Sequence, residues 1–326
     1  MLQQFINELN PSRNTTNLMR SYLFDRKVST CVNNCWSPFK VIDIGIPQGG
    51  VLPPLLFAFF LSDIKTLSLE GRTIMYADDL QILYSCHPTQ INSIEGIIRS
   101  DFAKIEKFMG DLHMKLNTSK TTVTKFGNKQ QLCKFQHDKI LIANEVGTNI
   151  LTKVRNLGLI YDANMTFRDH FETLSRTCSQ LLYHIRCIRP YLEPKIALLL
   201  VETFVISRIR TFAPIIGTAN SKNLQFLQKT INNALRVVYN LRKFDHISSF
   251  RSRVQWGDIN KLSQDAFTDM VNNVLQGRSS AYLNSLIEQS SHSLTRRQFY
   301  LSDRSNTNSG QRKFRHRAAV ILNRVL

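Results

Sequence analysis

The chain has 326 residues, 43% of them hydrophobic, which is enough to form the cores of about two domains. Its 42 Lys and Arg residues against 24 Asp and Glu give a net charge of +18, which favours nucleic acid or an anionic membrane as partner; a merely basic protein is the alternative. The N-terminus lacks a signal-peptide pattern, and the apolar run 51–61 is shorter than the roughly 20 residues of a membrane helix, so we expect a soluble intracellular protein, nuclear or cytoplasmic.

The first residues are predicted to form helices and a hairpin. Residues 1–24 suit a helix that is broken or capped at Asn14, Thr15 and Thr16. Short strands are expected at 27–32 and 36–44, joined at the turn-prone pair Asn33 and Asn34.

The next elements alternate between helix and strand. After a loop at 45–50, Pro53 and Pro54 open an apolar helix that ends near Ile64. The following elements are a strand–turn–strand over 72–84, a helix with an apolar stripe from Ile91 to Leu112, and strands at 121–126, 139–143 and 156–161. Residues 1–165 are therefore expected to form one α+β domain.

Beyond residue 165 the pattern is helical. Apolar stripes at helical spacing run from Phe171 to Ile188 and from Leu224 to Val238, and the segment 196–212 is apolar on two sides. We expect a helical region at 166–275 and a basic, loosely ordered tail at 276–326, which is rich in Ser, Asn, Gln and Arg.

The cysteines do not suggest a zinc site. Cys31 and Cys35 are separated by three residues, but no second pair of Cys or His lies nearby. We expect reduced and mostly packed thiols at all six positions, which are Cys31, Cys35, Cys86, Cys133, Cys178 and Cys187.

The tetrad Tyr76-Ala77-Asp78-Asp79 carries the strongest chemical signal. Adjacent carboxylates at a hairpin tip repel each other, and a divalent cation relieves that repulsion. Oxygen ligands indicate Mg²⁺, with Mn²⁺ as an alternative, and such a site can serve two-metal phosphoryl transfer. The alternative is an ordinary Asp-Asp turn in a solvated hairpin.

Four motifs in series give the chain a family resemblance. They are GIPQGGVLPPLLF at 45–57, YADDLQI at 76–82, KLNTSKT at 115–121 and NLGLIYD at 156–162. Their order and spacing resemble those of LINE-type (non-LTR) retrotransposon reverse transcriptases, especially the jockey-like elements. The segment Ser21-Tyr22-Leu23 with Arg26 and the segment 314–318 extend this resemblance over nearly the whole chain.

The resemblance implies an RNA-directed DNA polymerase with a partial fingers/palm domain at 1–165, an antiparallel sheet with packed helices, followed by a helical thumb. Asp78 and Asp79 would bind the metal, and Lys120 would lie near the leaving pyrophosphate. The implied substrate-binding residues are Pro47, Gln48, Gly49, Tyr76 and Ala77. Leu157 and Gly158 would form the primer grip, and the template, primer and deoxynucleoside triphosphates would be the partners.

The thumb would carry the nucleic-acid contacts, since each neutralised phosphate adds salt-sensitive affinity. The candidate residues are Arg176, Arg186, Arg189, Lys195, Arg208 and Arg210, with Arg312, Arg315 and Arg317 in the tail. A solvated helix face is the alternative for each residue alone.

The family's first catalytic carboxylate has no counterpart. The acids before Tyr76 are Glu8, Asp25, Asp43, Asp63 and Glu70, and none lies in a matching strand motif. Gly50 and Pro53 also replace the usual Ser and Gly of the Pro-Gln loop. We therefore expect the chain to begin after that carboxylate and to have little polymerase activity alone. A catalytically dead remnant that only binds nucleic acid is the alternative; a palm-fold nucleotidyl cyclase is disfavoured because its GG[DE][DE]F-type turn is missing.

Overall fold

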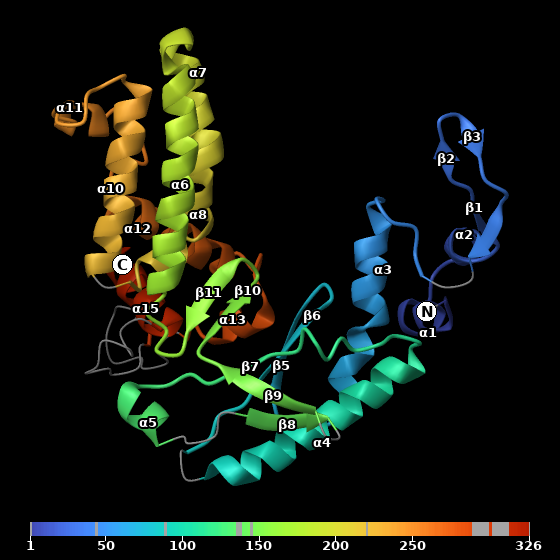
Figure 1. The fold of residues 1–326 in the computed structure, drawn as a ribbon. Coiled ribbons are helices and arrows are strands. Elements are labelled where there is room, and N and C mark those ends of the chain that lie inside the picture. The colour runs from blue at the N-terminus through green and yellow to red at the C-terminus, as the bar shows by residue number, and fades with distance from the viewer. Residues whose placement is uncertain are drawn as a thin grey trace. The chain divides into compact units, whose positions relative to one another are not determined.

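The computed structural model describes residues 2–42, 45–87, 90–134, 139–143, 146–219, 221–288, 300–301 and 313–325. The chain, drawn in Figure 1, divides into two compact units. The first unit comprises Met1–Val123 and Gln130–Ile150, and the second comprises Thr124–Lys129 and Leu151–Leu326. Both helices and small antiparallel sheets are present, so the expectation of a mixed α and β chain is confirmed.

The first unit begins with two helices, α1 (Leu2–Leu9) and α2 (Arg13–Leu23). The predicted break at Asn14–Thr16 is wrong, because α2 runs through those residues. The chain breaks at Asn10, whose φ is 42°, since Pro11 disfavours helix at the residue before it. Ser12 then caps α2, and its Oγ accepts a hydrogen bond from the Thr15 amide at 3.2 Å.

The predicted hairpin after α2 is confirmed. Strands β1 (Arg26–Val28) and β4 (Lys40–Ile42) pair with each other, as do β2 (Cys31–Val32) and β3 (Cys35–Trp36). Asn33 and Asn34 form the turn with φ values of 49° and 62°, a left-handed conformation that asparagine tolerates well.

The core of the first unit joins a short apolar helix, a hairpin and a long helix. These elements are α3 (Leu52–Phe60), the 3₁₀ helix η1 (Ser62–Thr66), β5 (Arg72–Tyr76), β6 (Asp79–Leu83) and α4 (Ile91–Asp111). Buried Leu61, Ile64, Ile105 and Met109 form the centre of this core. The apolar helix was expected to reach Ile64, but its last turn is 3₁₀ rather than α.

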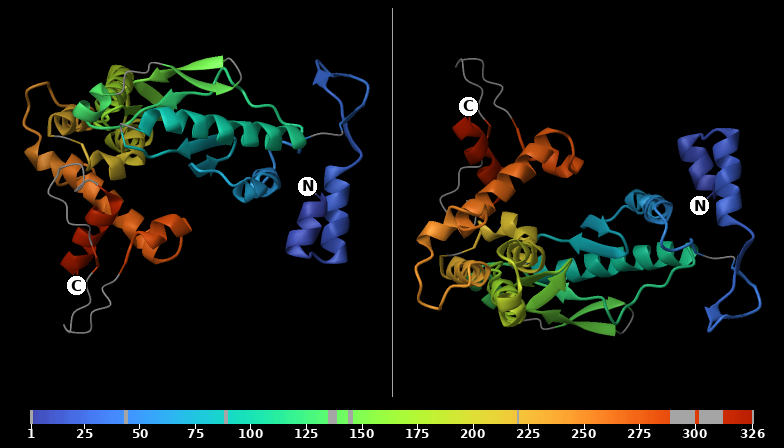
Figure 2. Two further views of the ribbon diagram at one scale, coloured as in Figure 1. Left: turned by 90° about the horizontal axis from the view of Figure 1, so that it is seen from below. Right: turned by 90° about the horizontal axis from the view of Figure 1, so that it is seen from above.

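A three-stranded antiparallel sheet follows in the order β7-β9-β8. Its strands are β7 (Val123–Thr124), β8 (Lys139–Ala143) and β9 (Val146–Leu151), and α5 (Lys129–Cys133) precedes β8. Strand β8 packs on α4, and Figure 2 shows the two side by side. The sequence pattern predicts neither β9 nor α5.

The second unit combines one hairpin with a helical core. The hairpin consists of β10 (Lys153–Asn156) and β11 (Leu159–Asp162), so the single strand expected at 156–161 is wrong. Its helices are α6 (Arg168–Ile188), η3 (Arg189–Tyr191), α7 (Pro194–Val201), the π-helix η4 (Glu202–Ile206), α8 (Ser207–Thr211), α9 (Ala213–Ile216), α10 (Ser221–Val238), α11 (Ser248–Arg251), α12 (Ile259–Leu275), α13 (Ala281–Ser285) and α15 (Phe314–Val325).

The central helices of this unit bury the apolar stripes read from the sequence. Phe171 and Cys178 on α6 and Leu227 and Ile231 on α10 have no exposed area. The segment from α7 to α8 lies in the same core, as expected for a helix with two apolar sides. Trp256 is fully buried beside it, and its indole N–H donates to Glu202 Oε1 at 2.8 Å.

The described part of the predicted loosely ordered tail includes helix α15. Ala318, Ala319 and Leu322 are buried, and α15 packs on α12. Arg317 stacks its guanidinium 3.7 Å from the centre of the Phe267 ring and donates to the Pro214 carbonyl at 2.8 Å. The partly buried Arg315 pairs with Glu288 at 2.8 Å, and Arg312 lies outside the described residues. Two of the proposed tail arginines thus make contacts within the unit.

The cysteines correct one expectation. All six are free thiols, but only Cys178 is buried, so the expectation of mostly packed thiols is wrong. The other five are exposed and lie in short strands, in a loop or on helices. Among the described residues, no helix combines the length and apolar character required to cross a bilayer.

Candidate active site and nucleic-acid-binding residues

The two adjacent carboxylates lie at the tip of the β5–β6 hairpin. The predicted strand–turn–strand is confirmed, but Tyr76 pairs with Asp79, so the turn is Ala77 and Asp78 alone and Asp79 begins β6. Both Asp78 and Asp79 are exposed. They offer an oxygen-only donor set that suits Mg²⁺, which also keeps water and substrate oxygens as ligands. Among the described residues, no group of three or more His, Cys, Asp or Glu side chains is arranged to hold a metal.

The turn itself has an unusual backbone. Ala77 has a φ of 52°, in the left-handed region that residues with a Cβ atom rarely adopt. This conformation costs an L-residue about 1–2 kcal/mol. Strained residues of this kind cluster at functional sites, where surrounding structure holds them in place.

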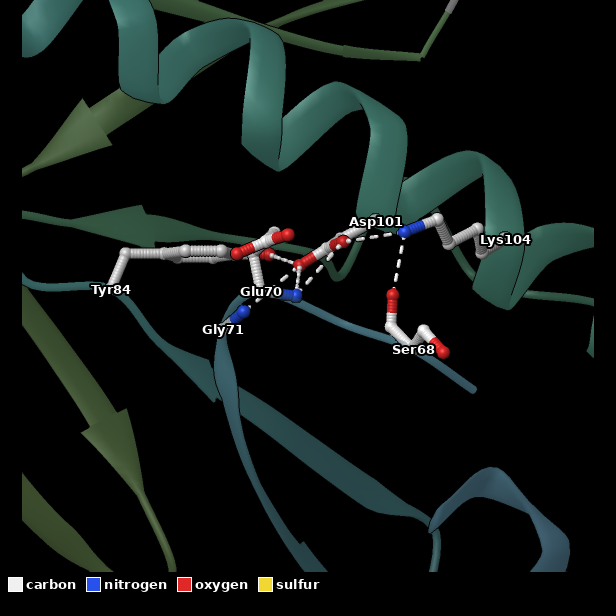
Figure 3. A network of polar contacts seen from close by, with 6 residues as sticks. All are labelled: Ser68, Glu70, Gly71, Tyr84, Asp101 and Lys104. Atoms are coloured by element: carbon white, nitrogen blue, oxygen red, sulfur yellow. Dashed lines mark hydrogen bonds and ion pairs between the residues drawn. The ribbon is translucent and has the colours of Figure 1, made fainter. Parts of the chain in front are cut away.

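The opposite end of the hairpin is tied to α4 by a buried carboxylate, Asp101 (Figure 3). Its oxygens accept hydrogen bonds from the amides of Glu70 and Gly71, each at 3.0 Å, and from the Tyr84 hydroxyl at 3.1 Å. Lys104 lies 3.5 Å away and also donates to the Ser68 carbonyl at 2.6 Å. Asp101 therefore holds the residue before β5 and the residue after β6 at once.

These contacts change the acidity of both groups. Burial of Asp101 opposes its ionisation, but the hydrogen bonds from Gly71, Glu70 and Tyr84 and the charge of Lys104 lower its pKa overall. Burial and the neighbouring Asp101 charge raise the pKa of Tyr84 far above its usual value. The carboxylate is thus ionised and the phenol protonated over the whole neutral range.

Gly71 makes this arrangement possible because it has no side chain. A Cβ atom there would lie 2.3 Å from Ile82 Cγ2 and 2.6 Å from the Tyr84 ring. Such distances are far below van der Waals contact. Any larger residue would push β6 and Tyr84 away from Asp101.

The Pro-Gln loop is anchored by the segment that precedes it. Arg26 donates from Nη2 to the Gly45 carbonyl at 2.6 Å and from Nε to the Leu23 carbonyl at 3.1 Å. Gly45 and Gly49 both have a φ of 88°, which glycine adopts without strain. Pro47 is partly buried, whereas Gln48 and Gly49 are exposed and accessible to a ligand.

The two departures from the usual loop sequence are neighbours in space. A Cβ atom on Gly50 would lie 3.2 Å from Pro53 Cδ and 3.7 Å from the Tyr22 hydroxyl. The first distance is tighter than most Cβ contacts, so a serine at position 50 would crowd Pro53. Glycine at 50 therefore accommodates proline at 53, which occupies the first turn of α3.

One apolar core connects three of the four motifs. Phe57 of α3, Met75 and Leu80 of the hairpin, and Leu116 beside Asn117 all pack against the same buried residues. The helix after the Pro-Gln loop and the acidic hairpin are thus parts of one packed body, as a shared site requires.

Lys120 lies in a tight turn that Asn117 organises. The Asn117 side-chain oxygen accepts hydrogen bonds from Ser119 Oγ at 2.6 Å and from the Lys120 amide at 3.2 Å. The Lys120 side chain is exposed. The turn therefore fixes the backbone and leaves the ammonium group accessible.

Leu157 and Gly158 form a two-residue hairpin turn in the second unit. Their φ values are 47° and 81°, the left-handed pair that closes a tight hairpin. Asp162, the last residue of the same motif, accepts hydrogen bonds from the Phe167 amide at 2.6 Å and the Thr166 amide at 3.1 Å. It thereby stabilises the connection into α6, a role that sequence reasoning missed.

Five of the six basic residues predicted to bind nucleic acid in the helical region are exposed, and the sixth, Arg189, is buried. Arg176 and Arg186 on α6, Lys195 on α7, and Arg208 and Arg210 on α8 are exposed. Exposed cations on neighbouring helices suit phosphate binding.

Arg189 is the exception and corrects the sequence analysis. It is only 8% exposed, and its guanidinium donates to the Val237, Val238 and Leu192 carbonyls at 2.8–3.2 Å. These bonds satisfy carbonyls at the end of α10 that have no partner within the helix. Arg189 therefore has a structural role and does not present its charge to a ligand.

Sequence reasoning also missed Asp101. A charged residue that continues the spacing of Ile94, Ile98 and Ile105 was the available signal, because an acid on the buried face of a helix needs partners. Among the acids that precede Tyr76, Asp43 lies outside the described residues.

Comparison with known proteins supports the motif resemblance. Residues 3–160 match the family model described as reverse transcriptase (RNA-dependent DNA polymerase). The chain is 26% identical over 181 residues, 52% of its length, to the probable RNA-directed DNA polymerase from transposon BS of Drosophila melanogaster. It is 25% identical over 170 residues, 49% of its length, to the RNA-directed DNA polymerase from mobile element jockey of Drosophila funebris.

These matches cover only part of the relatives. The matched region spans 19% of the transposon BS protein and 18% of the jockey protein. Transposon BS and jockey are both non-LTR retrotransposons. Residues 3–160 of the chain are therefore similar to the reverse transcriptase family, and the curated relatives that match this region are RNA-directed DNA polymerases of mobile elements.

Proposed function

We propose that the chain forms part of an RNA-directed DNA polymerase whose acidic site is Asp78 and Asp79. The observation that carries this proposal is the shared core. It packs the helix after the Pro-Gln loop, the acidic hairpin and the segment before Lys120 into one body. The exposed carboxylates at the hairpin tip are accessible to a metal-bound nucleotide.

In this proposal Asp78 and Asp79 bind Mg²⁺ or Mn²⁺ through their oxygens. When bound, the metal ions supply charge neutralisation on the triphosphate and lower the pKa of the attacking primer hydroxyl. Pro47, Gln48 and Gly49 shape the pocket for the incoming deoxynucleotide and the template, and Tyr76 and Ala77 lie beneath the primer end. Lys120 stabilises the departing pyrophosphate through its charge.

The second unit would then serve the primer and template. Leu157 and Gly158 act as the primer grip, and the exposed cations Arg176, Arg186, Lys195, Arg208 and Arg210 contact the phosphate backbone. In family terms, residues 1–165 act as the partial fingers/palm, 166–275 as the thumb and 276–326 as a basic extension.

Primer extension on an RNA template tests the proposal. The purified chain is incubated with template, DNA primer, deoxynucleoside triphosphates and Mg²⁺. Whatever synthesis the wild type supports should fall by at least about 100-fold in Asp78→Asn, because the metal loses a ligand in the transition state. Asp111→Asn removes the same charge from the exposed end of α4 and should leave synthesis unchanged.

The same assay separates the two functions considered for the chain. Synthesis abolished by Asp78→Asn supports the polymerase and contradicts the expectation of a nearly inactive chain. RNA binding that weakens with salt, without incorporation in wild type, supports the binding-only alternative instead. The exposed basic helices of the second unit are the observation that favours that alternative.

A further inference from the structure

A second basic surface lies outside the residues considered above. It is formed by residues 239–254, which lie between α10 and α12 and are called the 239–254 loop. It contains four Lys or Arg residues and one acid. The four cations are Arg242, Lys243, Arg251 and Arg253, and the acid is Asp245.

The loop is held in one conformation by its own contacts. Asn240, with a φ of 54°, ends α10, and the Leu241 amide donates back to the Arg236 carbonyl at 2.8 Å. The Tyr239 and Phe250 rings pack against each other at a tilt of 35°, with their centres 4.5 Å apart. Buried Ile247 fixes the middle of the loop in the main core of the unit.

The single acid of the loop is used inside the turn. The Asp245 carboxylate accepts a hydrogen bond from the Arg242 amide at 2.7 Å, and the Asp245 amide donates to the Arg242 carbonyl at 3.2 Å. Its charge helps to order the turn. The Arg242 and Lys243 side chains are exposed on that same turn.

The turn also presents an exposed aromatic ring next to a lysine. The Phe244 side chain is 86% exposed, and the Lys243 ammonium lies 5.4 Å from the centre of its ring. Single exposed apolar residues are common, but an ordered basic turn that places a lysine beside an exposed ring has the chemistry of a base-stacking site.

A second exposed ring lies at the same end of the unit. Arg189 bonds to the Val238 carbonyl at the end of α10 and thereby brings η3 to the start of the loop. Tyr191, the last residue of η3, is 88% exposed. Figure 1 shows the start of α7 and the helix α11 at this one end of the helical unit.

We propose that the 239–254 loop and Tyr191 bind single-stranded nucleic acid without sequence preference. Unpaired bases stack on the Phe244 and Tyr191 rings, and Arg242 and Lys243 neutralise the adjacent phosphates. A single strand fits better than a duplex, because paired and stacked bases do not offer their faces to a protein ring. This site goes beyond the proposed polymerase function, since it requires neither metal nor catalysis.

Binding of the full chain to a labelled single-stranded RNA tests the proposal. Phe244→Ala should weaken binding by about 5-fold or more, from the usual worth of one base–aromatic stack. Phe39→Ala removes a ring that is 76% exposed in the first unit and should have no effect. An RNA duplex of equal length should bind wild type and Phe244→Ala equally.

The contribution of the Lys243 charge to RNA binding is measured from the salt dependence of Kd. Lys243→Ala should reduce the slope of log Kd against log salt concentration by about 0.7, the value for one phosphate of a single strand. Lys107→Ala, at an exposed position on α4, is the matched control. Equal slopes in wild type and Lys243→Ala would overturn the phosphate contact.

The tryptophans provide a direct probe of stacking. Trp36 is 73% exposed and Trp256 is fully buried, so Trp36→Phe leaves one shielded tryptophan. In that background, Phe244→Trp places a reporter in the turn, and single-stranded RNA should quench its emission. Emission that responds to anionic lipid vesicles but not to RNA would overturn the proposal in favour of a membrane surface.

Discussion

The Tyr84 hydroxyl donates a hydrogen bond of 3.1 Å to the buried carboxylate of Asp101, although the two residues are 17 positions apart. Through this bond, and through the amides of Glu70 and Gly71, helix α4 holds both strands of the hairpin that carries Asp78 and Asp79. The acidic tip is thus the free end of a hairpin that is fixed at its base.

Asp101→Asn should destabilise the chain by about 1–3 kcal/mol, because an amide cannot accept every hydrogen bond that the carboxylate accepts. The urea midpoint measures this loss, with Asp111→Asn as the exposed control. The folded-state pKa of Asp101 is lowered, so its contribution is present above the ordinary pKa of about 4 and is lost as the pH falls through the folded-state value. The difference in unfolding free energy between the wild type and Asp101→Asn should therefore shrink in acid. A difference that stays constant down to about pH 2 would contradict this account.

Gly71→Ala should cost about 1–3 kcal/mol, since its Cβ atom would overlap Ile82 and Tyr84. Gly96→Ala provides a matched control in the interior of α4, where a Cβ atom would meet nothing within 4 Å. That change should stabilise the helix by about 1 kcal/mol. The thermal or urea unfolding midpoints of the two variants should therefore shift in opposite directions. Midpoint shifts of the same sign would be inconsistent with the packing around Gly71.

Ala77→Gly should stabilise the chain by about 0.5–1 kcal/mol, because glycine adopts a φ of 52° without the steric cost that alanine bears. Ala103→Gly, at an exposed position in α4, should instead destabilise by about 1 kcal/mol. Urea midpoints check both values. If the two substitutions destabilised equally, the left-handed turn would not exist in solution.

Arg189→Ala should destabilise the second unit by about 3 kcal/mol, because the carbonyls of Leu192, Val237 and Val238 lose a charged donor. Arg186→Ala, exposed on α6, should change stability by no more than about 0.5 kcal/mol. Unfolding followed by circular dichroism reports the difference. Similar small effects from both would restore Arg189 as a candidate for phosphate binding.

Thiol titration should separate Cys178 from the other cysteines. Five of the six are exposed, whereas burial raises the pKa of Cys178 to about 11. At pH 8 a disulfide reagent should react quickly with five thiols in the native chain and with six after denaturation. In Cys178→Ala the native count should remain five, and a fall to four would show that Cys178 is accessible.

Local patterns predicted those elements whose signals are local. The apolar spacing of α4, α6 and α10, the prolines that open α3 and the asparagine turn at 33–34 each determine a nearby conformation. The β5–β6 hairpin is also predicted, because two apolar runs flank a tight turn, but its register with Tyr76 opposite Asp79 comes from the structure alone.

Contacts between distant segments were not predictable in the same way. The hairpin groups that bond to Asp101 lie 17–31 residues away, and the α10 carbonyls that bond to Arg189 lie 48–49 residues away, so no local spacing identifies these partners. The charge of Arg189 indicated a surface residue, and only the position of α10 shows why it is buried. The common core of the three motifs likewise depends on tertiary packing.

The proximity of Gly50 and Pro53 links two positions that are three residues apart in sequence. Randomising either position alone would sample mostly crowded or loosened combinations, so a mutant library of this loop should vary the two together. The Tyr22 hydroxyl, also close to the same point, makes position 22 the natural third site of such a library.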